Sequence, residues 1–136
     1  MLEHWADKPL GDWQTQGKIK APRALMARFL LNRDLDAANA YLIQQQPWGT
    51  VGSTWVGHPD GDYDFTSAGL TPILFLFGDD PTILYPETRE HLLHALLPLS
   101  GGDPLVTVPG SFGAVTDTEN HLLMTEGSRY LGDRRK

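Results

Sequence analysis

Apolar residues recur at helical spacing in several stretches of the chain, and the clearest of these covers residues 21–32. The spacing predicts a helix here, and Pro22 suits its first turn because a residue at that position needs no backbone N–H partner. The inward face of this helix is expected to hold Leu25, Met26, Phe29 and Leu30. A helix with one apolar stripe must pack against another element, so a partner is expected nearby.

The next stretch, residues 34–46, predicts that partner. Leu35, Ala38 and Leu42 fall at helical spacing, and Asp34 suits the N-cap position. Together the two helices would form an antiparallel helical hairpin around residues 32–34.

Three more helices are predicted further along the chain. Asp64 can cap a helix over residues 65–78, which should kink or restart near Pro72. Pro86 opens a second helix, and Asp117 or Thr118 would cap a third over residues 117–131. The inward positions of the second of these helices are Leu92, Leu93, Leu96 and Leu97.

The remaining segments are predicted to be irregular. Residues 1–20 contain glycine and proline, with Trp5 and Trp13 as anchors. Two long loops rich in glycine separate the helices, residues 47–64 and 100–113, and the second contains a short extended piece at residues 105–108.

The predicted class is therefore all-α, with residues 1–136 forming a single helical domain. The order of elements is helix pair, long loop, helix pair, long loop, single helix, which is the rhythm of an α/α toroid. Five helices make only part of such a ring. The chain is then an incomplete toroid, a short helical domain, or a protomer that completes its core as a homo-oligomer, and apolar faces would be exposed in the first and third cases.

The composition of the chain limits the classes of partner and the chemistry that are expected. A formal charge of −6 disfavours nucleic acid, which is bound mainly through Lys and Arg. The chain has no cysteine, so disulfides and thiolate chemistry are excluded. The first residues lack a signal pattern, and no apolar run is long enough to span a membrane, so no membrane partner is expected. A cytoplasmic location follows by default, or export if the chain is part of a longer precursor.

Five segments carry a resemblance to a known group of proteins: PLGDWQTQGKIKAPRALMARFLL, PWGTVGSTW, GDYDF, LYPETREHLLHALL and DTENHLLMTEGSRYL. Together, from about Leu10 to Leu131, they resemble a family of large uncharacterised bacterial proteins of α/α-toroid type. The last segment is the most specific. That family continues beyond its helix, whereas this chain ends after residues 132–136, so a partial member is expected. The general likeness to toroid polysaccharide lyases and glycosidases implies activity on carbohydrates, by analogy of fold alone.

A carboxylate, an amide and an imidazole stand together at the head of the last predicted helix, as Glu119, Asn120 and His121. In a lyase, Asn120 or His121 would neutralise a uronate carboxyl, and Tyr63 would serve as partner base. The alternative is purely local: Thr118 caps the helix, Glu119 favours its positive end, and His121 is a partly buried structural histidine.

The stretch GDYDF places Asp62 and Asp64 on either side of Tyr63. An EF-hand is excluded, because its sixth and twelfth loop positions would be Phe65 and Thr71, which leaves a looser calcium site as an alternative. If Asp62 or Asp64 faced Glu119, the pair could hydrolyse a glycoside, with retention at a spacing of about 5–5.5 Å and inversion at about 6.5–9.5 Å.

Aromatic and polar residues in the loops are candidates for binding sugar. Trp48 and Trp55 offer flat faces among small residues, with Asp62 and Arg129 as polar partners, although either tryptophan would equally anchor its loop on the core. His58 has no second histidine at ligand spacing. His91 and His94 are expected on a solvated helix face.

The hypothesis is a carbohydrate-active helical protein, lyase-like or glycosidase-like, that acts on a polysaccharide or oligosaccharide without cofactor or metal. Nucleotide-binding glycine loops, the nucleophile elbow and the HExxH zinc motif do not occur in the sequence. The alternatives are a non-catalytic helical module that binds a glycan or a protein, and a helical homo-oligomer with a structural role.

Overall fold

The computed structural model of the chain describes residues 1–17, 19–45, 63–96, 105–107, 114–116, 127, 130–131 and 134. Residues 14, 63–67, 95–96 and the two strands are described by their backbone alone. Helices predominate among the described residues, which confirms the all-α class at that level. The helices are α1 (Leu2–Ala6), α2 (Trp13–Gln16), α3 (Lys20–Leu30), α4 (Leu35–Gln44), α5 (Tyr63–Phe77) and α6 (Pro86–Leu96).

A short two-stranded ladder joins the extended pieces of the C-terminal part. Strand β1 (Leu105–Thr107) pairs antiparallel with β2 (Ala114–Thr116), with Val106 opposite Val115. The extended piece expected at residues 105–108 is thereby confirmed for its first three residues, whereas β2 was not predicted. The predicted helix over residues 117–131 is described only at residues 127, 130 and 131, which are helical.

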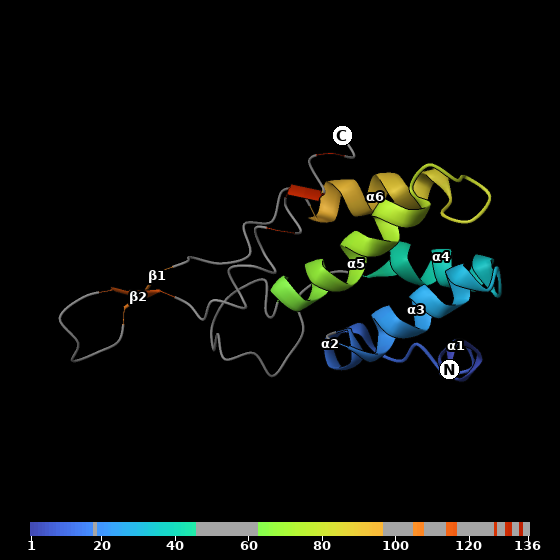
Figure 1. The fold of residues 1–136 in the computed structure, drawn as a ribbon, viewed down its shortest axis with the longest axis horizontal. Helices are drawn as coiled ribbons and strands as arrows, with labels where there is room; N and C mark the ends of the chain where they lie inside the picture. The colour runs from blue at the N-terminus through green and yellow to red at the C-terminus, as the bar shows by residue number, and fades with distance from the viewer. Residues whose placement is uncertain are drawn as a thin grey trace.

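Helix α3 is the centre of the helical body. It contacts α1, α2, α4 and α5, and α6 packs against α4 and α5. Figure 1 shows α1 and α2 at one end of the body and α6 at the other, with α3, α4 and α5 between them. No helix in the described ranges is long and apolar enough to cross a membrane.

The core forms where the apolar stripe of α3 meets α4 and α5. Pro22 lies in the first turn of α3 as predicted, and the rings of Phe29 and Phe77 pack with their centroids 5.7 Å apart. The prediction for Leu30 was wrong: its side chain is 49% exposed, because α3 ends at this residue and the chain turns away. The buried core consists of Leu10, Trp13, Ala21, Ala24, Leu25, Phe29, Ala38, Leu42, Leu70, Ile73, Leu74, Phe77, Leu84 and Leu92.

The turn between α3 and α4 uses two left-handed residues. Asn32 and Asp34 both have φ of 52°, a conformation that Asn and Asp tolerate better than other side chains. Asp34 occupies the predicted N-cap position of α4, but its side chain makes no capping hydrogen bond. The reason is local, because a capping side chain usually needs an extended backbone at that residue.

A buried asparagine ties α4 to the segment before α6. Asn39 is 1% exposed, and its Nδ2 donates to the carbonyls of Leu35 and Ile83, both at 2.9 Å. Its Oδ1 accepts from the backbone N–H of Tyr85 at 2.9 Å. Because the Ile83 carbonyl and the Tyr85 N–H both find their partner in this one buried amide, Asn39 fixes the start of α6 relative to α4.

Helices α3 and α5 approach closely at a glycine. A Cβ atom on Gly69 would lie 2.8 Å from the ring carbons of Pro22, so only the absence of a side chain permits this contact. Helix α5 continues through Pro72, so of the two predicted alternatives the restart was wrong, whereas the kink stays a prediction. On α6, Leu92 is fully buried and Leu93 partly buried, as the spacing predicted.

The N-terminal segment is more regular than predicted. Residues 2–6 and 13–16 are helical, so the expectation of an irregular segment over residues 1–20 was wrong. Asp12 caps α2, its Oδ2 accepting from the N–H of Thr15 at 3.1 Å. Trp13 is buried against Tyr41, and Trp5 is partly buried, which agrees with their predicted role as anchors.

Candidate functional site

The residues proposed from sequence lie almost entirely outside the described part of the chain. Tyr63 and Asp64 are the first two residues of α5, where only the backbone is described. The predicted N-cap role of Asp64 was wrong, because the helix already begins at Tyr63. The residues outside the described part are Trp48, Trp55, Asp62, Glu119, Asn120, His121 and Arg129. Their convergence with Tyr63 and Asp64 remains a prediction.

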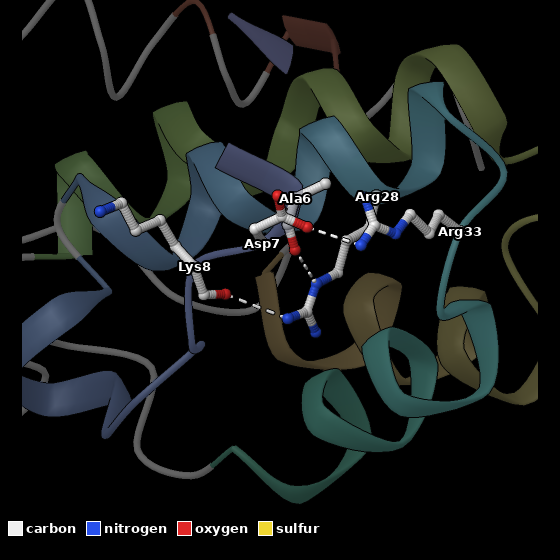
Figure 2. Close-up of polar contacts among 5 residues, drawn as sticks. All are labelled: Ala6, Asp7, Lys8, Arg28 and Arg33. Atoms are coloured by element: carbon white, nitrogen blue, oxygen red, sulfur yellow. Dashed lines mark hydrogen bonds and ion pairs between the residues drawn. The ribbon is translucent and has the colours of Figure 1, made fainter. Parts of the chain in front are cut away.

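Among the described residues, a candidate site lies where α1 docks on α3. Arg28 of α3 holds the docked segment: its Nε donates to the carbonyl of Ala6 at 3.1 Å, and one Nη donates to the carbonyl of Lys8 at 3.0 Å. Figure 2 shows Arg28 and Arg33 reaching to this segment, with Arg33 paired to Asp7 at 2.5 Å. The backbone around Lys8 is therefore held by charge-assisted hydrogen bonds.

The same docking places the Trp5 indole. The guanidinium carbon of Arg23 lies 5.5 Å from the centre of the indole ring, within the range of a cation–π contact. The His4 ring meets it edge-on, with centroids 6.1 Å apart and planes at 82°. Two contacts from different elements thus orient an aromatic side chain that remains partly exposed.

A pocket of about 510 Å³ opens beside Trp5, and it is termed the polar pocket because five of its eight lining residues carry polar or charged side chains. Its volume falls in the range of small-ligand sites, which is roughly 300–1,000 Å³. It is built by the end of the α1 segment, by α2 and by the first residue of α3. The residues that line it are Trp5, Lys8, Pro9, Gly11, Asp12, Thr15, Gln16 and Lys20.

Some of the polar groups in this pocket are already engaged. The carboxylate of Asp12 caps α2, and the hydroxyl of Thr15 donates to the Asp12 carbonyl at 3.3 Å. The two lysines differ from Asp12 and Thr15 in this respect. Neither Lys8 nor Lys20 forms a side-chain ion pair or hydrogen bond with any residue in the described part. The groups left to meet a ligand are therefore two ammonium ions, the Gln16 amide and the Trp5 ring.

A second pocket, of about 540 Å³, adjoins the first, and Trp5 lines both. This one is apolar, and Arg23 carries the one charged side chain among the residues that line it. Its lining residues are Met1, Leu2, Trp5, Pro22, Arg23, Met26, Ala27 and Gly69. Trp5 therefore borders a polar and an apolar hollow on the same end of the molecule.

Perturbed ionisable groups lie elsewhere. Burial, with a smaller contribution from Asp12, raises the pKa of Tyr41 to about 12. A hydrogen bond from the Thr82 hydroxyl lowers the pKa of Asp80, and the hydrogen bond to Asp36 raises that of Tyr85. None of these three groups lines either pocket.

The two histidines of α6 differ in their exposure. His94 is 83% exposed, with Nε2 3.8 Å from Glu90, as expected for a solvated face. His91 is partly buried, so the prediction of a solvated position was wrong for this residue. Over the described ranges, no group of three or more His, Asp or Glu side chains is arranged to hold a metal ion.

The pocket beside Trp5 was not predicted. The sequence marked Trp5 as an anchor, but its polar neighbours come from separate stretches at residues 8–16 and 20. A tryptophan, two lysines and a glutamine within sixteen residues are the only signal that pointed to it. Such a signal is common in segments without a site.

Comparisons with protein-family models, with characterised proteins and with solved structures found no significant match for this chain.

Proposed function

We propose that this chain is a carbohydrate-binding helical protein and that the polar pocket beside Trp5 is a glycan subsite. The observation that carries the proposal is the partly exposed indole at the edge of a pocket whose free polar groups are nitrogen donors. Sugars present an apolar face of C–H groups and a rim of hydroxyls. An aromatic ring suits the first, and the Gln16 amide and the lysine ammonium groups suit the second.

Part of the pocket is already ordered before any ligand binds, which supports a binding role for the partly exposed Trp5 ring. The Trp5 ring is oriented by Arg23, and the backbone at Lys8 is held by Arg28, so the indole and the backbone that carries the Lys8 side chain are already placed. A site whose groups are ordered before binding loses less conformational entropy when the ligand arrives.

The carbohydrate-active version of the proposal extends to the C-terminal motif. In it, the chain is part of an α/α toroid built from antiparallel helix pairs, and Asn120 and His121 act on a glycan together with Tyr63. The support is the segment DTENHLLMTEGSRYL and the resemblance it carries. His121→Ala separates the two versions, because an enzyme loses turnover while it keeps its ligand, whereas a binding module has no turnover to lose.

The test is binding of an oligosaccharide panel made of glucose, galactose, mannose and uronic acid units, measured by calorimetry. Trp5→Ala should weaken binding at least about fivefold, because truncating an aromatic anchor costs roughly 1 kcal/mol or more. Trp5→Phe, which retains an aromatic face, should weaken it less.

A third variant tests whether weaker binding in Trp5→Ala comes from altered structure around Trp5 rather than from a lost contact with the ligand. Gln16→Ala removes a donor without touching the contact between Trp5 and Arg23, and should also weaken binding. If no member of the panel binds, or if Trp5→Ala binds as the unaltered protein does, the glycan subsite is refuted.

A homo-oligomer is the second candidate, favoured by large apolar side chains on the surface. Leu30 is 49% exposed, Phe75 43% and Leu76 59%. Such side chains are costly in water when they gather in a patch. A monomeric mass by analytical ultracentrifugation at high protein concentration would exclude this candidate.

A further inference from the structure

The charge of the pocket beside Trp5 differs from that of the whole protein. The chain carries a formal net charge of −6, so its average field repels anions. The pocket, in contrast, is lined by Lys8 and Lys20 against one carboxylate, that of Asp12. A local excess of positive charge in an acidic protein identifies the sign of the group that would be bound there.

The three charged residues are not equivalent. The Asp12 carboxylate accepts a hydrogen bond from the backbone of Thr15 and is committed to the cap of α2. Lys8 and Lys20 are exposed, and neither has an ion-pair partner within the described part of the chain. Within the described part of the chain neither ammonium group is held in an ion pair, and the pocket lining carries two positive side chains against the one negative charge of Asp12.

The two lysines also come from different elements that are fixed relative to each other. Lys8 follows α1, and its carbonyl is held by Arg28 of α3. Lys20 is the first residue of α3 itself. The separation of their backbones is therefore set by the docking of α1 on α3, which allows two-point recognition of a ligand rather than loose attraction.

We propose that this pocket selects acidic saccharides, in which an anionic group on the sugar pairs with Lys8 and Lys20 while the ring lies against Trp5. The inference rests on the proposed glycan subsite and adds its specificity. Carboxylate and sulfate groups share the required charge, and separate probes distinguish them.

The experiment compares three tetrasaccharides by calorimetry on the full chain: tetragalacturonate, its full methyl ester, and a sulfated galactan tetrasaccharide. Tetragalacturonate should bind more tightly than the ester, and the preference should fall as ionic strength rises from about 0.01 M to about 1 M, where charges are screened within about 3 Å. If the sulfated probe alone binds better than the ester, the anion is a sulfate rather than a carboxylate.

Matched double variants assign the preference to the lysines. Lys8→Gln/Lys20→Gln should lower affinity for tetragalacturonate about three- to tenfold, the range expected for two exposed ion pairs. It should lower affinity for the ester less, because glutamine keeps an N–H donor for the sugar hydroxyls at both positions. Lys8→Arg/Lys20→Arg keeps both charges and should retain the preference. Circular dichroism of each variant confirms that the fold is intact.

The outcomes separate this inference from the proposed function. If the acid and its ester bind equally and Trp5→Ala weakens both, charge selection is wrong and the glycan subsite stands. If the preference survives in Lys8→Gln/Lys20→Gln, the lysines do not make it and the inference is overturned. If none of the three probes binds, the inference also fails, and failure of the neutral oligosaccharides as well would remove the glycan subsite.

Discussion

Replacing Asn39 by alanine tests the main polar connection in the helical body. The side chain is buried and makes three hydrogen bonds, two as donor and one as acceptor, all at 2.9 Å. The bond to Leu35 lies within α4, whereas those to Ile83 and Tyr85 reach the segment before α6. The substitution therefore leaves the Ile83 carbonyl and the Tyr85 N–H without their partner.

The expected loss in the free energy of unfolding follows from the Ile83 carbonyl and the Tyr85 N–H. A buried polar group that loses its partner costs about 1–3 kcal/mol, so the pair predicts a loss of about 2–6 kcal/mol in the free energy of unfolding. A domain of this kind has about 5–15 kcal/mol in total, so the variant would lose a large share of its stability.

Urea unfolding followed by tryptophan fluorescence measures the effect, because Trp13 is 1% exposed and reports on burial. With an m-value of about 1.5 kcal/mol/M, a loss of 3 kcal/mol lowers the midpoint by about 2 M. The control is Tyr85→Phe, which removes only the exposed hydrogen bond to Asp36 and should cost less than about 1 kcal/mol.

The comparison of the urea midpoints of the two variants tests whether the buried Asn39 amide positions α6. If Asn39→Ala lowers the midpoint no more than Tyr85→Phe does, the buried amide contributes nothing beyond a surface hydrogen bond. The account of how α6 is positioned would then be wrong.

Three further substitutions and one pH dependence have definite expected results. Gly69→Ala should destabilise the protein by about 1–3 kcal/mol in thermal unfolding, because the new methyl group would lie 2.8 Å from the ring of Pro22. Unchanged stability would show that α3 and α5 can move apart at no cost. Tyr41→Phe should be neutral or stabilising at pH 7, since the buried hydroxyl has no hydrogen-bond partner among the described residues; a loss above about 1 kcal/mol would contradict this. In the unaltered protein, burial raises the pKa of Tyr41 from 10.0 to about 12, so the tyrosine ionises at a lower pH in the unfolded chain than in the folded one. The free energy of unfolding should therefore fall between about pH 10 and pH 12, and this fall should be smaller in Tyr41→Phe. Arg28→Gln should loosen residues 1–8, seen as faster amide exchange there than in α6, and equal rates would show that other contacts hold the segment.

Helix positions were predictable where periodicity and proline acted together. The apolar spacing around Leu25 and Phe29, with Pro22 in the first turn, located α3 to within about one or two residues at each end. Similar signals located α4 and α6. The errors came at helix ends, where Leu30 proved exposed and Asp34 adopted a left-handed backbone that prevents capping. End positions depend on where the chain must turn, and periodicity carries no information on that.

The N-terminal segment shows why the site escaped prediction. Helices α1 and α2 have five and four residues, too short for a periodic pattern and too short to be stable alone. They are helical because Arg28 and the core residue Trp13 hold them against the rest of the protein. The pocket beside Trp5 follows from that docking, so local sequence could not indicate it.

The sequence by itself determined the helical class, the central helices and the acidic character of this protein, because propensity, periodicity and charge are properties of local stretches. Only the tertiary structure decided which face of α3 receives α1, where Gly69 lets α5 approach Pro22, and which lysines share a pocket with Trp5. Those outcomes depend on contacts between residues distant along the chain. Their energies are set by packing and hydrogen bonding in three dimensions, which no local pattern encodes.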